Sequence, residues 1–248
     1  MASPTHQFEI KPLIPLEIAG VDISFTNSSL WMMIALGVSI CLMSLATRKM
    51  AMVPGRMQAF GEGMYDFIDG MIRDNLGEHG KQYFTLIFTL FFIVFFGNAL
   101  GLVPYSFTYT SHLAVTAALA FLVFFMVIGL GIARHGLHFF SIFLPPGVPA
   151  WLVPLVFLLE LISFLIRPVT LSVRLFANMV AGHIMMKVFA GFSVGLLSLG
   201  ALGFGLGLLP MGMNIVMIGF ELLIAYLQAY VFTVLCCIYL KDTLDLHH

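Results

Sequence analysis

Six charged side chains occur in the long apolar stretch between residues 82 and 240, and acidic and basic groups of this kind can take part in chemistry. They are Arg134, Glu160, Arg167, Arg174, Lys187 and Glu221. A charge inside a membrane span costs about 2.5–3.5 kcal/mol on insertion scales, so we expect such side chains to face protein or water. Glutamate and histidine can pass protons on, whereas arginine keeps its proton at any biological pH. These residue types favour a proton path beside a permanent positive charge.

The spacing of the polar residues places them on shared helix faces. On the segment from about 151 to 189, one stripe steps by three or four residues: Glu160, Ser163, Arg167, Thr170, Arg174 and Asn178. On the segment from about 210 to 240, three polar residues lie seven apart: Asn214, Glu221 and Gln228. Two helices can turn such faces toward each other, and the pattern indicates an aqueous or protein-lined path.

His183 lies on a different face of its helix from the arginine that precedes it. It follows Arg174 by nine residues, which is about half a turn out of phase and roughly 13 Å along the axis. A helix that shows a permanent cation to one side and a titratable imidazole to the other can separate two chemical compartments. This separation is what a gated proton path requires.

A structural interpretation competes with this one for the uncharged residues. Asn178, Gln228 and Ser163 are also suited to hydrogen bonds between helices, which contribute about 0.6–2 kcal/mol each in membranes. Arg174 fits that interpretation poorly, because an intramembrane cation without an acid in its own helical turn is costly to keep for packing. A purely structural anchor is the plainest alternative for the whole chain.

The remaining titratable residues each have a second interpretation. Arg167 and Lys187 can extend their charged ends to a membrane interface, and Arg134 marks the inner boundary of its span. Glu160 either pairs with Arg167, seven residues later, or lines a water-filled exit. His112 is either a solvated loop residue or a proton acceptor.

The composition excludes several classes of protein. The 248 residues are 60% hydrophobic and 9% charged, far from the roughly one quarter of charged residues in a soluble domain. A net charge of −1 gives no electrostatic footprint for nucleic acid. Cys41, Cys236 and Cys237 have neither the number nor the spacing of a disulfide framework or a zinc site. We therefore expect lipid as the main solvent, and neither a metal nor a cofactor.

The first half of the chain predicts three spans and one surface helix. No charged residue occurs between Lys81 and Arg134, a stretch of 52 residues that must hold two spans, at about 83–103 and 113–133, divided by the turn-like GLVPYSFTYTSH. An earlier span is predicted at 30–47. Over 54–77, apolar residues recur at intervals of three and four, which is typical of an interfacial amphipathic helix. The N-terminus lacks the basic start of a signal peptide.

The last hundred residues predict a long helical hairpin. Its arms are expected at 151–189 and 210–240, on either side of the glycine-rich run 191–212, and both are long enough to be steeply tilted. Basic residues gather around the surface helix, whereas residues 1–28 carry only Lys11, so the positive-inside rule places the N-terminus outside. Five crossings return the C-terminus to the inside. The prediction is one all-α integral membrane domain over residues 1–248.

Two long segments of the sequence resemble a known family. They are LELISFLIRPVTLSVRLFANMVAGH (159–183) and FELLIAYLQAYVFTVLCCIYL (220–240), and both look like the a subunit of F-type ATP synthase. The chain length, the N-terminal HQFEIKPL and the FFGNALGLVPYSF segment fit the same family, so the resemblance covers nearly the whole chain. It implies a stator subunit beside a rotating ring of c subunits.

The resemblance also implies roles for single residues. Arg174 matches the essential arginine of the family, Asn178 the asparagine one turn later, and Gln228 the glutamine of the last helix. Glu160 matches the glutamate near the inner half-channel. The resemblance thus implies two aqueous half-channels that Arg174 separates.

The acid and imidazole of the outer half-channel depart from a well-known bacterial pattern. That pattern has Glu where this chain has His183, and His where this chain has Glu221, an exchange that resembles mitochondrial and alphaproteobacterial relatives. Gly101 stands where the bacterial pattern has an aspartate. We therefore expect the outer path to use Asn98 and His112 in addition to the pair, with Asn214 on the same face as Glu221.

The function that the resemblance implies is proton translocation without catalysis in this chain. Chemistry on ATP would occur elsewhere, since no GxxxxGK[ST] phosphate loop is present. The implied partners are the c ring, b-type peripheral stalk subunits, lipid and protons, and the implied location is a bacterial inner membrane or, alternatively, the mitochondrial inner membrane. A proton-coupled secondary transporter is the alternative function, but it should show two related halves, and the sequence shows none. A cytochrome would need paired histidines, and only His183 lies deep in a predicted span.

Overall fold

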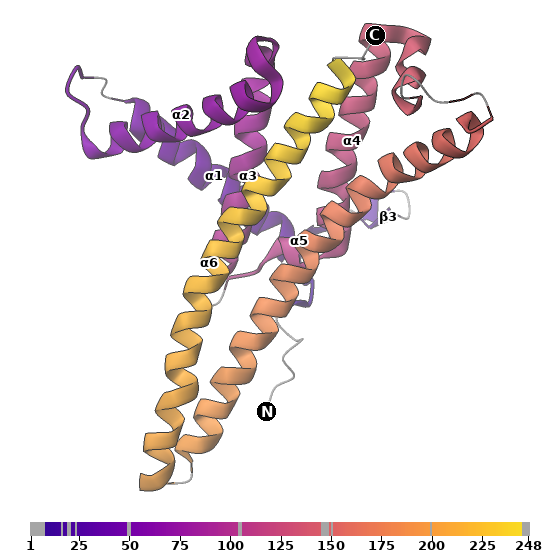
Figure 1. Ribbon diagram of the computed structural model, residues 1–248. Helices are drawn as coiled ribbons and strands as arrows, with labels where there is room; N and C mark the ends of the chain where they lie inside the picture. Colours follow the sequence, from indigo (N-terminus) through magenta and orange to yellow (C-terminus); the bar gives the residue numbers. More distant parts are fainter. Residues whose placement is uncertain are drawn as a thin grey trace. The chain divides into compact units, whose positions relative to one another are not determined.

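The computed structural model of this chain is built mainly from helices (Figure 1). It describes residues 8–15, 17–18, 21–22, 24–48, 51–103, 106–144, 149, 151–198 and 200–244. The long helices are α1 (Asn27–Thr47), α2 (Arg56–Leu76), α3 (Phe84–Gly101), α4 (Leu113–His135), α5 (Val153–Leu197) and α6 (Ala201–Leu244). Shorter 3-10 helices are η2 (Gly77–Tyr83), η3 (Tyr109–Ser111) and η4 (Gly136–Phe143). Near the N-terminus, β1 (Pro12–Ile14) pairs antiparallel with β4 (Phe25–Thr26), and β2 (Glu17–Ile18) with β3 (Val21–Asp22).

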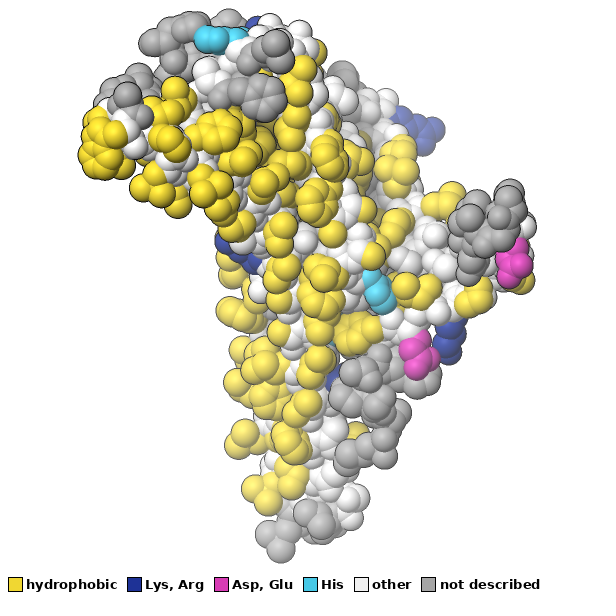
Figure 2. All heavy atoms as spheres, turned by 90° about the vertical axis from the view of Figure 1, so that its right-hand side faces the viewer, with side chains coloured by type: hydrophobic (Ala, Val, Ile, Leu, Met, Phe, Trp, Pro, Cys, Tyr) yellow, Lys and Arg dark blue, Asp and Glu magenta, His cyan; other side chains and the backbone are white. Residues whose placement is uncertain are grey.

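Five helices in the described parts of the chain are long and apolar enough to cross a membrane. They are Asn27–Thr47, Gly80–Gly101, Leu113–His135, Val153–Leu197 and Gly205–Leu244. Helices are the expected form, because they satisfy every backbone polar group where water is absent. Hydrophobic side chains cover much of the face drawn in Figure 2, and few charged ones appear on it. The prediction of an all-α integral membrane protein with about five crossings is confirmed.

The additional helix α2 is amphipathic, as predicted. Its buried residues recur at intervals of three and four: Ile68, Met71, Ile72 and Leu76. Asp69 and Arg73 form an ion pair of 2.7 Å one turn apart. The helix ends at Gly77, whose φ of +64° lies in the left-handed region that favours glycine.

The long hairpin is confirmed, but its turn lies elsewhere than predicted. We expected helices at 151–189 and 210–240, yet α5 continues to Leu197 and α6 begins at Ala201. The glycine-rich run therefore stays helical on both sides of Gly200, whose φ of +80° marks the turn. The reason is that an unpaired backbone group costs several kcal/mol in an apolar environment, more than glycine's weak helix propensity. The tilt of the hairpin stays a prediction.

The chain divides into two compact units, each built from segments far apart in sequence. The first unit holds the chain up to Leu42, Phe92–His112 and Leu175–Ala229. The second holds Met43–Phe91, Leu113–Arg174 and the chain from Tyr230. Residues 1–7 of the predicted outer segment 1–28, and residues 245–248, lie outside the described residues. One membrane domain over 1–248, with its N-terminus outside and its C-terminus inside, stays a prediction.

In the first unit, the end of α5 and the beginning of α6 lie side by side (Figure 1). Close approach depends on a glycine: the Ser193 hydroxyl donates to the carbonyl oxygen of Gly207 at 3.1 Å. A Cβ on Gly207 would lie 3.0 Å from Leu197 Cγ and 3.3 Å from the Ser193 carbonyl oxygen. Small residues and hydroxyl groups hold membrane helices together in this way.

The core of the second unit is aromatic. Phe124, Phe139, Phe143 and Phe164 are buried together, and the ring centroids of Phe124 and Phe164 are 5.0 Å apart. Gly131 of α4 leaves room for this packing, since a Cβ there would overlap Thr243 of α6 and Phe139 of η4. The 3-10 helix η4, which the sequence analysis did not predict, supplies two of the four phenylalanines.

Candidate ion path

An imidazole and a carboxylate meet in the first unit. His183 of α5 is buried, and its Nε2 atom lies 3.9 Å from Oε1 of Glu221 on α6. The Phe8 ring and the imidazole pack in a T-shaped arrangement with their centroids 6.2 Å apart. The structure therefore brings together the acid and the base that the sequence analysis selected from residues 38 positions apart.

Glu221 is held in a space that a glycine provides. Its side chain is 2% exposed, and neither carboxylate oxygen has a hydrogen-bond partner among the described residues. A Cβ on Gly182 of α5 would overlap the carboxylate. A buried carboxylate without a hydrogen-bond donor is costly as an anion, so His183 is the described group best placed to share a proton or a charge with it.

A second polar pair bridges the same two helices. The side-chain amide of Asn178 donates to Oε1 of Gln228 at 3.2 Å. Gln228 is 4% exposed, and its Nε2 atom has no partner in the described part of the chain. Two residues from each arm thus face each other; spacing predicted this for Asn178 and Gln228, whereas the pairing of His183 with Glu221 was implied by the resemblance.

Two other predicted residues of the first unit, one buried and one half-buried, hydrogen-bond to none of the predicted site residues. Asn98 of α3 is fully buried, and both of its amide atoms lack a partner among the residues described. Asn214 on α6 is half-buried, and its Oδ1 atom also lacks a partner among these residues. Buried amides that stay unpaired are unusual in folded proteins, because each costs about 1–3 kcal/mol. Such groups are suited to water or to a passing ion.

The sequence analysis did not select Thr108, which contacts the imidazole directly. Its Oγ1 atom lies 2.9 Å from Nε2 of His183, and its side chain is 5% exposed. Thr108 lies in the chain between α3 and η3. Because this segment is not a regular helix, residue spacing could not predict which way Thr108 faces. The only signal was its position in the turn-like segment next to buried spans.

The loop around Thr108 is packed rather than solvated. The Tyr109 hydroxyl donates to the carbonyl oxygen of Ile93 at 3.0 Å, and burial raises the pKa of this phenol. His112 stacks on Phe107 with ring centroids 5.2 Å apart, and burial lowers its pKa. His112 is thus half-buried against an aromatic ring, and both interpretations of it, as a loop residue in contact with water and as a proton acceptor, stay predictions.

In the second unit, Arg167 has a different partner from the one considered. Its Nη1 atom lies 3.4 Å from Oδ2 of Asp242, and its guanidinium lies 5.4 Å from the centroid of the Tyr239 ring. The alternative in which Arg167 pairs with Glu160 is therefore wrong. Two helical turns separate Glu160 from Arg167, a distance of roughly 10 Å along the axis. Glu160 is half-buried.

The other predicted residues of the second unit are accessible. Ser163 and Arg174 both have exposed side chains on α5. Arg174 forms no ion pair with another described residue. An exposed guanidinium on a membrane-spanning helix is available to a group outside this chain.

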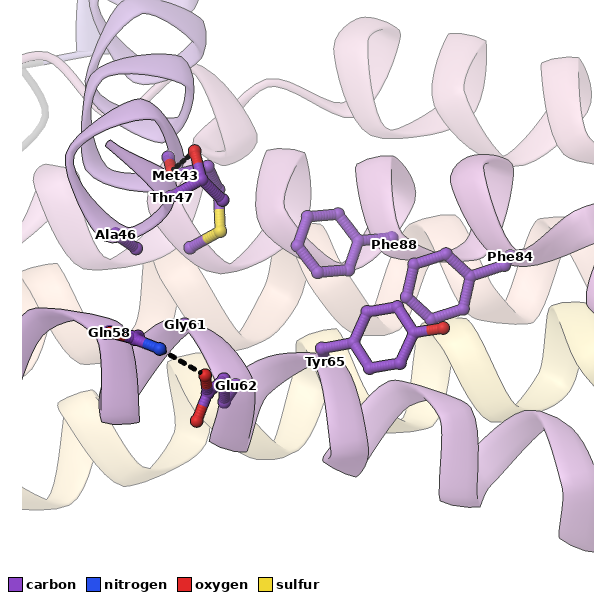
Figure 3. Close-up of a pocket in the computed structure, with 9 residues that line it drawn as sticks. All are labelled: Met43, Ala46, Thr47, Gln58, Gly61, Glu62, Tyr65, Phe84 and Phe88. Atoms are coloured by element: carbon purple, nitrogen blue, oxygen red, sulfur yellow. Dashed lines mark hydrogen bonds between the residues drawn. The ribbon is translucent and has the colours of Figure 1, made fainter. Parts of the chain in front are cut away.

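A pocket of about 360 Å³ in the second unit lies apart from all of the predicted site residues (Figure 3). It is lined by the end of α1, by α2 and by α3: Met43, Ala46, Thr47, Gln58, Gly61, Glu62, Tyr65, Phe84 and Phe88. Gln58 donates to Glu62 at 2.8 Å along one side of it. Aromatic rings and aliphatic groups line most of the rest, and Glu62 is the one charged residue of the lining, so the pocket offers no acid–base pair.

The fold and these contacts define a class: a multi-span α-helical membrane protein that buries an acid and an imidazole between its two longest helices. Comparison with known proteins identifies the family. The family model described as ATP synthase A chain matches residues 29–241. ATP synthase subunit a of Rhodospirillum rubrum is 51% identical over 247 residues, covering 100% of both chains. The subunits from Chelativorans sp. and Rhizobium leguminosarum are also 51% identical, over 99% and 97% of this chain and 98% and 96% of their own lengths.

The chain belongs to the ATP synthase subunit a family, and the resemblance seen in the sequence is confirmed. It is a membrane-sector subunit of an F-type ATP synthase, and it works within a complex of several subunits.

Proposed function

We propose that this chain is the proton-translocating stator subunit of its ATP synthase. It forms two aqueous half-channels against the c ring, and it does not itself catalyse chemistry on ATP. The observation that carries the proposal is the buried pair of His183 and Glu221, 3.9 Å apart between two membrane-spanning helices. Such a pair has no packing advantage over apolar residues, but it can exchange a proton.

The outer half-channel uses the polar residues of the first unit. Protons enter from the outer side near Asn98, pass the pair of His183 and Glu221, and protonate a carboxylate of the neighbouring ring. The amides of Asn178, Asn214 and Gln228 border this path. The unpaired atoms of Asn214 and Gln228 support this role, because a group that binds a passing proton or water must have free hydrogen-bonding capacity.

The inner half-channel uses Glu160, Ser163 and Arg174 of the second unit. A neutral ring carboxyl can face lipid, and it loses its proton after nearly a full rotation, when it meets Glu160 and Ser163. Arg174 then stabilises the resulting carboxylate, since a guanidinium favours the charged form over the neutral acid. The same positive charge prevents a direct proton leak between the two half-channels.

The family and the charge distribution support the remaining parts of the proposal. The c ring and b-type peripheral stalk subunits are the partners. The bacterial relatives support a bacterial inner membrane, with mitochondria as the alternative. Basic residues around α2 support an N-terminus outside and a C-terminus inside.

The test is ATP-driven proton pumping by vesicles that carry Arg174→Ala in the assembled complex. We expect pumping to be abolished, because the ring carboxylate loses its counter-charge. Arg134→Ala is the matched control, since Arg134 is another exposed arginine of a membrane-spanning helix, and it should pump like the unmodified complex. Pumping by Arg174→Ala at the rate of Arg134→Ala would contradict the proposal.

A further inference from the structure

We propose that Thr108 is a positioning residue for proton exchange between His183 and Glu221. Its hydroxyl keeps the Nε2 atom of His183 hydrogen-bonded both before and after the proton leaves. This inference rests on the proposed function, since it assigns the group that holds the imidazole of the outer half-channel in place.

The hydroxyl of Thr108 lies between two partners of different character. One is Nε2 of His183 at 2.9 Å, which donates or accepts according to its protonation. The other is the carbonyl oxygen of Gly101 at 3.3 Å, which can only accept. A threonine hydroxyl carries one hydrogen and two lone pairs, so it can donate to only one of them at a time.

Both arrangements of the hydroxyl are available at low cost because of Ser106. The Ser106 hydroxyl donates to the same Gly101 carbonyl oxygen at 2.9 Å. When Thr108 donates to Gly101, its lone pair accepts from a protonated Nε2. When Thr108 turns its hydrogen to a bare Nε2, the Gly101 carbonyl keeps the hydrogen bond from Ser106. The imidazole nitrogen is therefore paired in both states.

The proton step follows from this geometry. In the charged state, His183 is an imidazolium, Glu221 is a carboxylate, and Nε2–H points toward Thr108 with Glu221 Oε1 at 3.9 Å. The N–H bond at Nε2 breaks and an O–H bond forms at Oε1, which leaves a neutral imidazole with its hydrogen on Nδ1 and a neutral acid. A side-chain movement of about 1 Å brings the two atoms within hydrogen-bond reach, or one water joins them.

The surroundings fix Thr108 and leave His183 few other partners. A Cβ on Gly101 would overlap the Thr108 side chain, so glycine at this position makes room for the threonine. The Ser111 hydroxyl donates to the Thr108 carbonyl oxygen at 2.6 Å and holds the loop from the other side. The Phe8 ring packs against His183 in a T-shaped arrangement, and Lys187 lies one turn further along α5. The terminal side-chain torsion of histidine has a broad, roughly two-fold energy profile. Without Thr108, the imidazole can therefore rotate about this torsion.

The experiment compares five variants in the assembled ATP synthase in proteoliposomes. Thr108→Val removes the hydroxyl and keeps the shape, and Thr108→Ser keeps the hydroxyl. Thr110→Val is the matched control, because Thr110 is a buried threonine of the same loop whose hydroxyl has no partner among the described residues. We expect Thr108→Val to lower ATP-driven proton flux about tenfold, as for the loss of a hydrogen bond to a charged group. Thr108→Ser and Thr110→Val should pump nearly like the unmodified complex.

A second readout separates positioning from a structural role. Nitrogen-15 magnetic resonance of labelled histidine reports which ring nitrogen of His183 carries the hydrogen. In the unmodified complex the neutral ring should carry it on Nδ1. The fourth variant, Ser106→Ala, leaves the Gly101 carbonyl dependent on Thr108, so the Thr108 hydrogen turns to Gly101 and the hydrogen of the neutral ring should move to Nε2.

The outcomes are distinct. Equal flux in Thr108→Val and Thr110→Val, or an unchanged His183 spectrum in both Thr108→Val and Ser106→Ala, would overturn the inference. Loss of flux that Thr108→Ser fails to restore would overturn it as well, since that result indicates a packing role. His183→Ala at full flux would instead refute the proposed function itself.

Discussion

Adding one methyl group at Gly182 should separate the acid from the imidazole without removing either. A Cβ at Gly182 would lie 2.6 Å from Cδ of Glu221, whereas ordinary contact begins near 3.4 Å. The carboxylate must therefore move away from α5 by about 1 Å. Because His183 is the next residue on α5, its separation from Glu221 should grow from 3.9 Å to about 4.9 Å.

The size of the effect follows from Coulomb's law. With an effective dielectric constant of about 20, the attraction between unit charges falls from about 4.3 to about 3.4 kcal/mol over that change of distance. The difference of about 0.9 kcal/mol corresponds to roughly a fourfold smaller population of the charged pair. If proton exchange passes through that pair, ATP-driven proton flux in Gly182→Ala should fall about fourfold.

A matched substitution on the same helix controls for the change from glycine to alanine. A Cβ at Gly191 meets nothing within 4 Å, so Gly191→Ala adds helix propensity without a clash. Flux is measured by quenching of a pH-sensitive dye in vesicles, after normalisation to ATP hydrolysis. Equal flux in the two variants would show that the separation of His183 and Glu221 does not control proton transfer.

Three further predictions concern other contacts. Arg167→Met should speed hydrogen exchange in the last turn of α6 about fivefold. The reason is that the partly exposed ion pair with Asp242 and the contact with the Tyr239 ring together contribute about 1 kcal/mol to the stability of that turn. An unchanged exchange rate would contradict this prediction. A double-mutant cycle on the denaturation of the subunit with Asn178→Leu and Gln228→Leu should give a coupling of about 0.6 kcal/mol, and strictly additive effects would exclude the hydrogen bond. Burial lowers the pKa of His112, so this group stabilises the loop while it is neutral, and the stability is lost as the pH falls below about 6.5. The protection factors of residues 106–112 in hydrogen exchange, which are corrected for the intrinsic effect of pH on exchange, should fall in acid, and His112→Gln should remove this fall.

The sequence was sufficient to predict those parts of the fold in which apolar or polar residues recur at regular intervals. Long apolar runs must become helices in a membrane, and spacing of three, four and seven residues placed Asn178, Glu221 and Gln228 on the faces where the structure has them. The end of the hairpin was predicted wrongly, because glycine was weighed as a helix breaker, as it is in water. In an apolar environment the cost of unpaired backbone groups is larger, and the helices continue to Leu197 and from Ala201.

Contacts that depend on loops or on distant partners could not be predicted. Thr108 lies in a segment without a period, so nothing in the sequence indicated that its hydroxyl would reach His183, 75 residues later. The partner of Arg167 is also 75 residues away, on a turn of α6 beyond the predicted end of that helix. Local spacing suggested Glu160 instead, since it is the acid nearest in sequence.

The central claim is that His183 and Glu221 act as one proton-transferring unit, and exchanging the two residues tests it most directly. The measurement is ATP-driven proton flux in His183→Glu, in Glu221→His and in the double variant that carries both substitutions. The account predicts that each single variant loses most of its flux and that the double variant recovers a substantial part, because one acid and one imidazole again face each other. A double variant that pumps no better than either single one would contradict the account.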